Sequence, residues 1–87
     1  MVRTQFSGRD IAKVLRNHGY RNAGRTGSHL KLRWESPDWD EVRVVSVPMK
    51  SEDEIPAGTL RSIADQCGAN DFREWCRWID EHRYDTN

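Results

Sequence analysis

Residues 29–35 alternate between polar and apolar side chains, the pattern of a strand with one face in a core and the other in solvent. A turn-forming segment at residues 36–40 follows, and residues 42–47 are rich in β-branched side chains. So short a connection predicts an antiparallel hairpin. A sheet of this kind needs its apolar face covered, which limits the chain to folds that supply helices for that purpose.

A helix is predicted ahead of the hairpin, over about residues 8–17. Ser7 directly precedes it and is typical of an N-cap. Residues 20–25 are expected to form a short first strand. Gly24 and Gly27 are expected to bracket a turn that joins this strand to the hairpin.

Two helices are predicted after the hairpin. The first begins near Pro56 and ends at Gly68, because apolar residues recur at helical spacing between them. The second spans about residues 70–82 with Asn70 as its N-cap, and Trp78 is expected to stay partly exposed on it. The apolar face of this last helix must be buried, and it consists of Phe72, Trp75, Cys76 and Ile79.

The element order predicts an α+β fold in which a three-stranded antiparallel sheet is covered on one face by helices. We expect residues 1–87 to form a single domain, since 87 residues suffice for one core and no linker or repeat interrupts them. The core should comprise about residues 6–68. The helix at about residues 70–82 would then be an addition to that core.

Several classes of protein are disfavoured by the composition. No apolar stretch is long enough to cross a membrane, and the first residues lack the pattern of a signal peptide, so a cytoplasmic location is expected. Cys67 and Cys76 fit no metal-ligand spacing and lie on apolar helix faces. We therefore expect both to be reduced core residues, and we expect neither a metal nor another cofactor.

The formal net charge of zero conceals an asymmetry along the chain. Residues 1–33 contain eight Lys or Arg against one acidic residue, a net charge of +7, whereas residues 34–87 carry a net charge of −7. A basic segment of this kind indicates a site for a polyanion such as nucleic acid. Alternatively, the two halves fold against each other and neutralise their charges.

His29 begins the alternating strand, directly after Gly27 and Ser28. A histidine side chain can accept or donate a proton near neutral pH, and a glycine permits close approach of another molecule. Lys31 and Arg33 share the strand face of His29 and can bind a phosphodiester beside it. The alternative is that His29 is an ordinary strand residue with a satisfied hydrogen bond and no chemical role.

Four segments in this order carry a family resemblance: Ser7–Asp10, Gly27–His29, Val45–Pro48 and Pro56–Ile63. Together they resemble the HicA-type toxins, also called the YcfA-like family, over about residues 6–75. The resemblance implies a fold like that of a double-stranded-RNA-binding domain, metal-independent cleavage of mRNA and neutralisation by a HicB-like antitoxin. It also implies that His29 is the catalytic residue.

Cleavage of RNA without a metal is chemically reasonable because the 2′-hydroxyl is an internal nucleophile. The reaction needs a base for that hydroxyl, cations for the charged transition state and a proton for the leaving oxygen. We therefore predict His29 as general acid/base, while His18 is expected to serve the end of its helix and His82 to be exposed to solvent. The predicted RNA-binding residues are Gly27, Ser28, Lys31, Arg33, Arg25, Arg9 and Lys13.

Two other functions remain open at this point. One is a non-catalytic RNA-binding module of the same fold, which cleavage assays with and without His29 distinguish from a nuclease. The other is a protein-interaction domain that uses the acidic helix at residues 70–82. The nuclease and the RNA-binding module should both bind RNA less tightly as the salt concentration rises, because each phosphate contact releases counterions. A protein-interaction domain should show no such RNA binding.

Overall fold

The computed structural model describes residues 2–49 and 54–85. Its elements, in chain order, are α1 (Gly8–Asn17), β1 (Arg21–Thr26), β2 (His29–Glu35), β3 (Val42–Pro48), α2 (Ala57–Gln66) and α3 (Phe72–His82). The three strands form one antiparallel sheet in the order β1-β2-β3. The predicted α+β class and element order are confirmed.

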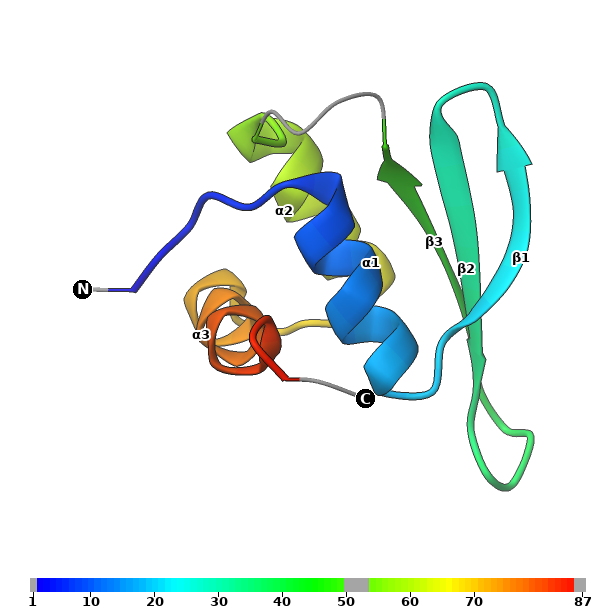
Figure 1. The fold of residues 1–87 in the computed structure, drawn as a ribbon. Coiled ribbons are helices and arrows are strands. Elements are labelled where there is room, and N and C mark those ends of the chain that lie inside the picture. The colour runs from blue at the N-terminus through cyan, green and yellow to red at the C-terminus, as the bar shows by residue number, and fades with distance from the viewer. Residues whose placement is uncertain (1, 50–53, 86–87) are drawn as a thin grey trace.

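The helices lie on one side of the sheet in two layers (Figure 1). α1 and α2 pack directly on the sheet, and α3 packs behind them against both helices. The apolar face predicted for the last helix packs on these two helices, with Trp75, Cys76 and Ile79 in the core, whereas Phe72 is only half-buried. Trp78 is half-buried, as predicted. No helix within the described ranges is long and apolar enough to span a bilayer.

The alternation of β2 is confirmed, because Leu30 and Leu32 are buried, whereas His29, Lys31 and Arg33 are exposed. Gly24 does not bracket a turn. It lies inside β1, where the pairing register with β2 shifts by one residue after Asn22. The turn between β1 and β2 consists only of Gly27 and its neighbour Ser28. Gly27 has a φ of +59°, the left-handed conformation that tight two-residue hairpins require.

The two edges of the sheet differ. The outer edge of β3 lies beside α2, where the side-chain oxygen of Gln66 accepts a hydrogen bond from the backbone N–H of Ser46 at 2.9 Å. All six residues of β1, at the other edge, are exposed. The outer edge of a sheet presents unpaired backbone N–H and C=O groups. Within the described residues, only the β3 edge has a side chain that hydrogen-bonds to one of these groups.

The start of α1 is packed against the end of β3. Ser7 caps the helix as predicted, with its hydroxyl oxygen accepting a hydrogen bond from the N–H of Asp10 at 3.2 Å. Gly8 lies so close to Pro48 that a Cβ at position 8 would stand 1.9 Å from the Pro48 carbonyl oxygen. This contact fixes the end of β3 against the helix, and Pro48 is the strand partner of His29.

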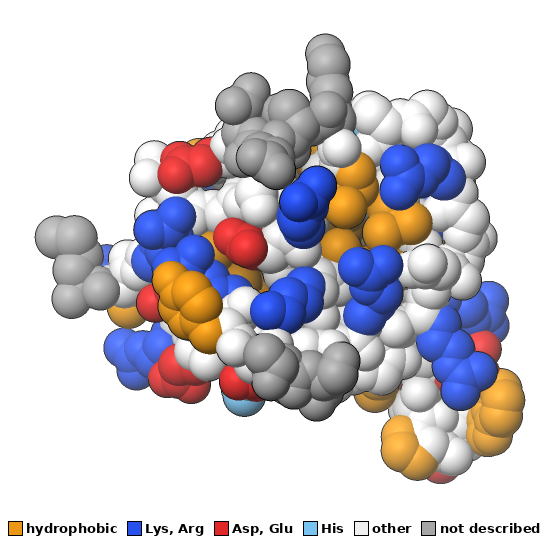
Figure 2. Space-filling view, viewed as in Figure 1, with side chains coloured by type: hydrophobic (Ala, Val, Ile, Leu, Met, Phe, Trp, Pro, Cys, Tyr) orange, Lys and Arg blue, Asp and Glu red, His pale blue; other side chains and the backbone are white. Residues whose placement is uncertain are grey.

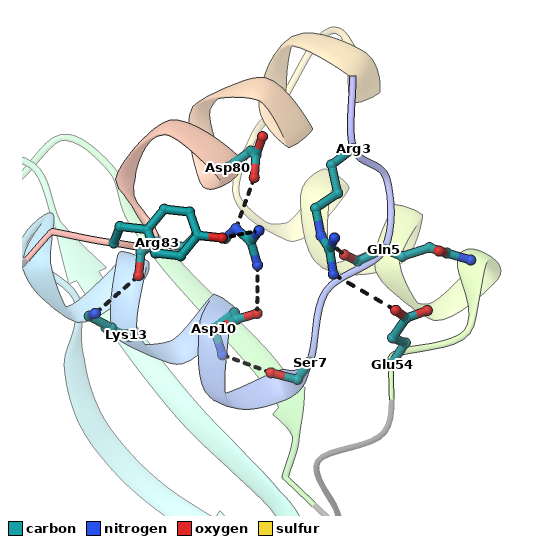
Figure 3. Close-up of polar contacts among 9 residues, drawn as sticks. Arg3, Gln5, Ser7, Asp10, Lys13, Glu54, Asp80 and Arg83 are labelled. Carbon is teal, nitrogen blue, oxygen red and sulfur yellow. Dashed lines mark hydrogen bonds and ion pairs between the residues drawn. The ribbon is translucent and has the colours of Figure 1, made fainter. Parts of the chain in front are cut away.

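Polar contacts fasten the end of α3 to α1 (Figure 3). Lys13 Nζ donates to the carbonyl oxygen of Arg83 at 3.0 Å, and the Arg83 guanidinium lies 3.7 Å from the Asp10 carboxylate and 2.8 Å from that of Asp80. The prediction that His82 is exposed to solvent is wrong. His82 is half-buried, with its ring 4.6 Å from that of His18.

The N-cap of α3 is Asp71 and not Asn70. Its carboxylate accepts hydrogen bonds from the N–H groups of Arg73 at 2.9 Å and Glu74 at 3.1 Å. Both residues suit the role chemically, and the choice between them depends on where the backbone leaves the Gly68 turn. A carboxylate at this position also interacts favourably with the positive end of the helix dipole.

We expect Asp71→Ala to lower the free energy of unfolding by about 1 kcal/mol, because two N–H groups of the first turn lose their acceptor. Asn70→Ala is the matched control and should have almost no effect. Urea unfolding followed by tryptophan fluorescence measures both. Equal losses from the two variants would contradict the assignment of Asp71 as the cap.

Candidate functional site

The described helices cover one face of the sheet, and we call the other face the open sheet face. Paired residues of antiparallel strands project from the same face, so the register identifies its members. It is formed by Arg21, Gly24 and Thr26 of β1, by His29, Lys31, Arg33 and Glu35 of β2, and by Val42, Val44, Ser46 and Pro48 of β3.

His29 lies at one end of this face, where the backbone is held from both sides. It pairs with Thr26 across the short turn and with Pro48 on β3. The carbonyl oxygen of Ser28 accepts a hydrogen bond from the N–H of Met49 at 2.6 Å, which continues the ladder past His29. The site therefore has a rigid backbone on a two-residue turn.

The side chain of His29 is exposed and has no hydrogen-bond or ion-pair partner among the described residues. This differs from the interpretation of His29 as a strand residue with a satisfied hydrogen bond. An exposed imidazole without a fixed partner is free to exchange a proton with a bound molecule.

Lys31 and Arg33 follow His29 along the same face, as predicted. Lys31 is exposed and has no side-chain partner within residues 2–49 and 54–85. Arg33 donates through Nε to the carboxylate of Glu35 at 2.9 Å. That pair is exposed, so it contributes little to stability and a phosphate can compete with Glu35 for the guanidinium.

The other predicted RNA contacts do not lie on this face. Arg25 pairs with the buried Leu30, so it projects from the helix-covered face at the β1 edge. Arg9 and Lys13 belong to α1, and Lys13 is held by the Arg83 carbonyl. Figure 2 views that side of the molecule and shows Lys and Arg side chains spread across it. The basic residues of the first half thus form two groups on opposite faces.

Arg21 belongs to the open sheet face but was missed by the sequence reasoning. A regular alternation backward from Thr26 would place Arg21 on the helix-covered face. The register shift between Asn22 and Gly24 reverses the alternation and pairs Arg21 with Arg33. A glycine within a strand is the signal for such a bulge, so Gly24 was the residue that indicated it.

Three buried groups with raised pKa values, Tyr20, Cys67 and Cys76, lie away from His29. Burial, with a smaller contribution from the neighbouring Cys67, raises the pKa of Tyr20 to about 12. Burial also raises the pKa of the Cys67 and Cys76 thiols, and both cysteines are free, as predicted. These groups stay protonated at neutral pH and serve packing.

Metal-binding side chains are not clustered in the described ranges, where no three His, Cys, Asp or Glu residues are placed to hold an ion.

A family model described as the HicA toxin of bacterial toxin–antitoxin systems matches residues 8–69. That range runs from the first residue of α1 to just beyond α2 and omits α3. Comparison with curated proteins and with solved structures gave no significant match.

Proposed function

Because this chain belongs to the HicA toxin family of bacterial toxin–antitoxin systems, we propose that it is a metal-independent endoribonuclease that cleaves mRNA. Membership of the family makes it the toxin of such a pair, with an antitoxin as protein partner and RNA as the general class of substrate. The observation that carries the nuclease proposal is the exposed His29, which has no partner among the described residues and is followed on its face by Lys31.

In the proposed reaction, the His29 imidazole accepts the proton of a ribose 2′-hydroxyl, and the 2′-oxygen attacks the adjacent phosphorus. The bond from phosphorus to the 5′-oxygen breaks, and that oxygen receives a proton from the imidazolium or from water. The products are a 2′,3′-cyclic phosphate and a 5′-hydroxyl. Lys31, the next residue of β2 on this face, stabilises the additional negative charge on the phosphate oxygens in the transition state, and Arg33 binds the RNA backbone further along the strand.

His18 and His82 lie among the helices, so His29 is the only histidine that the described chain places on the open sheet face. One imidazole then serves both proton transfers, or shares them with water. Slow turnover is the expected consequence, which is sufficient for a protein that arrests growth.

We propose Gly27, Ser28, Lys31 and Arg33 as the RNA contacts nearest to His29. Gly27 has open space around its α-carbon, so a nucleotide can approach the turn closely. Arg25, together with Arg9 and Lys13 of α1, contacts only RNA that passes around the β1 edge onto the helix-covered side, because the sheet separates these residues from the open face.

The antitoxin is proposed to be HicB-like, and the pair is proposed to act in the cytoplasm. We also propose that residues 1–87 form one domain. The support for this is the continuity of the core, in which Cys76 and Ile79 of α3 belong to the same cluster as Ile11 of α1 and Val45 of β3.

The nuclease proposal is tested by incubating the purified toxin with RNA in the presence of EDTA. We expect cleavage products with 2′,3′-cyclic phosphate ends, and no cleavage at a position whose ribose is replaced by 2′-deoxyribose, because the nucleophile is then absent. Cleavage of the 2′-deoxy position at the same rate would contradict the mechanism. RNA binding without any cleavage would instead support the non-catalytic RNA-binding module.

A further inference from the structure

A surface groove of about 510 Å³ lies at the end of the sheet opposite to His29. It is formed by the start of β1, the end of β2 and the tip of the hairpin between β2 and β3. Figure 2 shows this tip at the lower right, where hydrophobic side chains lie next to Lys or Arg side chains. The lining includes Arg21, Asn22, Arg33, Glu35, Pro37 and Trp39.

Trp39 is the most conspicuous residue of the groove. Its side chain is 76% exposed, more than that of any other large hydrophobic residue described. It also has a φ of +64°, which a bulky residue adopts only at a cost of about 1–3 kcal/mol. Glycine or asparagine would serve the turn better, so the indole is not there for the benefit of the fold.

The hairpin tip holds Trp39 in place by local hydrogen bonds. The N–H of Trp39 donates to the carbonyl oxygen of Ser36 at 3.0 Å, and the Ser36 hydroxyl donates to the Asp38 carboxylate at 2.8 Å. The hydrogen bonds from Ser36 and from the N–H of Asp40 lower the pKa of Asp38, so the carboxylate stays charged and keeps these donors. The indole is therefore presented on an ordered turn.

Two arginines face each other on the wall of the groove. Arg21 and Arg33 are direct cross-strand partners on the open sheet face. Like charges in that arrangement destabilise a sheet. Glu35 pairs with Arg33 only, and Arg21 has no side-chain partner among the described residues. The two positive charges of Arg21 and Arg33 therefore repel each other, and a bound anion between them would offset this repulsion.

We propose that this groove binds one nucleotide of single-stranded RNA, with its base stacked on Trp39 and its phosphate between Arg21 and Arg33. This inference rests on the proposed function, because it extends the RNA path along β2 from His29. Arg33 and His29 are four residues apart on one face, about 13 Å at the usual rise of a strand. One extended strand of RNA reaches both places.

A protein segment is the other occupant to consider, since Trp and Arg also dominate protein interfaces. The facing arginines favour RNA, because they match a phosphate and because a protein ligand would need an acidic group at the same point. Stacking on an aromatic side chain suits any base, so the groove contributes affinity more than sequence preference.

The test measures binding of a short single-stranded 2′-O-methyl RNA, which cannot be cleaved through its 2′-oxygen, to the full-length toxin. Trp39→Gly removes the indole and also the backbone strain. We expect it to weaken RNA binding roughly 5- to 100-fold, as for loss of one stacked base, while the midpoint of urea unfolding does not fall. Trp39→Phe should keep most of the affinity.

Tyr84→Ala is the matched control, because Tyr84 is 72% exposed but follows α3 on the far side of the helices. It should not change RNA affinity. Arg21→Ala should lower the slope of log affinity against log salt by about 0.7, as expected for one lost phosphate contact in a single strand.

The possible failures are distinguishable. If the unmodified toxin binds RNA and cleaves it, but Trp39→Gly binds as tightly, this inference is wrong and the proposed function stands. If Trp39→Gly binds RNA normally but no longer binds the antitoxin, the groove belongs to the protein partner and the inference is again wrong. If the unmodified toxin does not bind RNA at all, the proposed function fails together with the inference.

Discussion

Replacing His29 with alanine is expected to reduce RNA cleavage by about 10²- to 10⁴-fold, the usual contribution of general acid–base catalysis. The side chain is exposed and makes no hydrogen bond to another described residue, so its removal should leave the free energy of unfolding almost unchanged. RNA affinity should change little, because Lys31 and Arg33 remain. Single-turnover cleavage, urea unfolding and RNA binding measure the three quantities separately.

His82→Ala provides the matched control for this experiment. It also removes one imidazole, but from α3, where His82 contacts His18 and the Asp85 carboxylate. We expect full cleavage activity from this variant, with a small loss of stability. If the folded His29→Ala variant cleaves as fast as the unmodified chain, His29 is not the catalytic residue.

Gly8→Ala is expected to be the most destabilising single-methyl addition in the chain. The new Cβ would lie 1.9 Å from the carbonyl oxygen and 3.0 Å from the carbonyl carbon of Pro48, so backbone must move. Overpacking of this kind costs about 1–3 kcal/mol or more, a large share of the roughly 5–15 kcal/mol that stabilises a small domain. Urea unfolding should show a clear fall in the midpoint.

The same variant should impair the site. The added methyl group should push β3 away from α1 at Pro48, which is the strand partner of His29. We therefore expect the folded fraction of the variant to cleave RNA more slowly. Gly58→Ala is the control, because a Cβ at position 58 in α2 meets no atom within 4 Å. Alanine there should stabilise the helix by about 0.5–1 kcal/mol. A Gly8→Ala variant as stable as Gly58→Ala would contradict the close packing described here.

Features governed by neighbouring residues were predictable from the sequence. The burial of Leu30 and Leu32 follows from a period of two, and the Ser7 cap follows from the helix that it precedes. The choice of Asp71 over Asn70 was not predictable in this way, because both side chains can cap and the backbone path after Gly68 decides.

The grouping of basic residues was the part least accessible to sequence reasoning. Arg25 and Lys31 are six positions apart in one hairpin, yet they project from opposite faces of the sheet. Which face the helices cover depends on contacts between distant parts of the chain. Arg21 lies on the open sheet face only because of a single register shift in β1. The predicted RNA-binding residues therefore came from both sides of the sheet and did not include Arg21.

The difference between the two edges of the sheet bears on how the toxin behaves at high concentration. Gln66 occupies a backbone donor on β3, so another copy of the chain cannot add a strand there without displacing it. β1 has no such cover from the part of the chain that the structure describes, but its bulge at Gly24 interrupts a regular ladder, and Arg21 and Arg25 place like charges along it. Self-association through strand addition is thereby opposed at both edges, even when the chain is produced without its antitoxin.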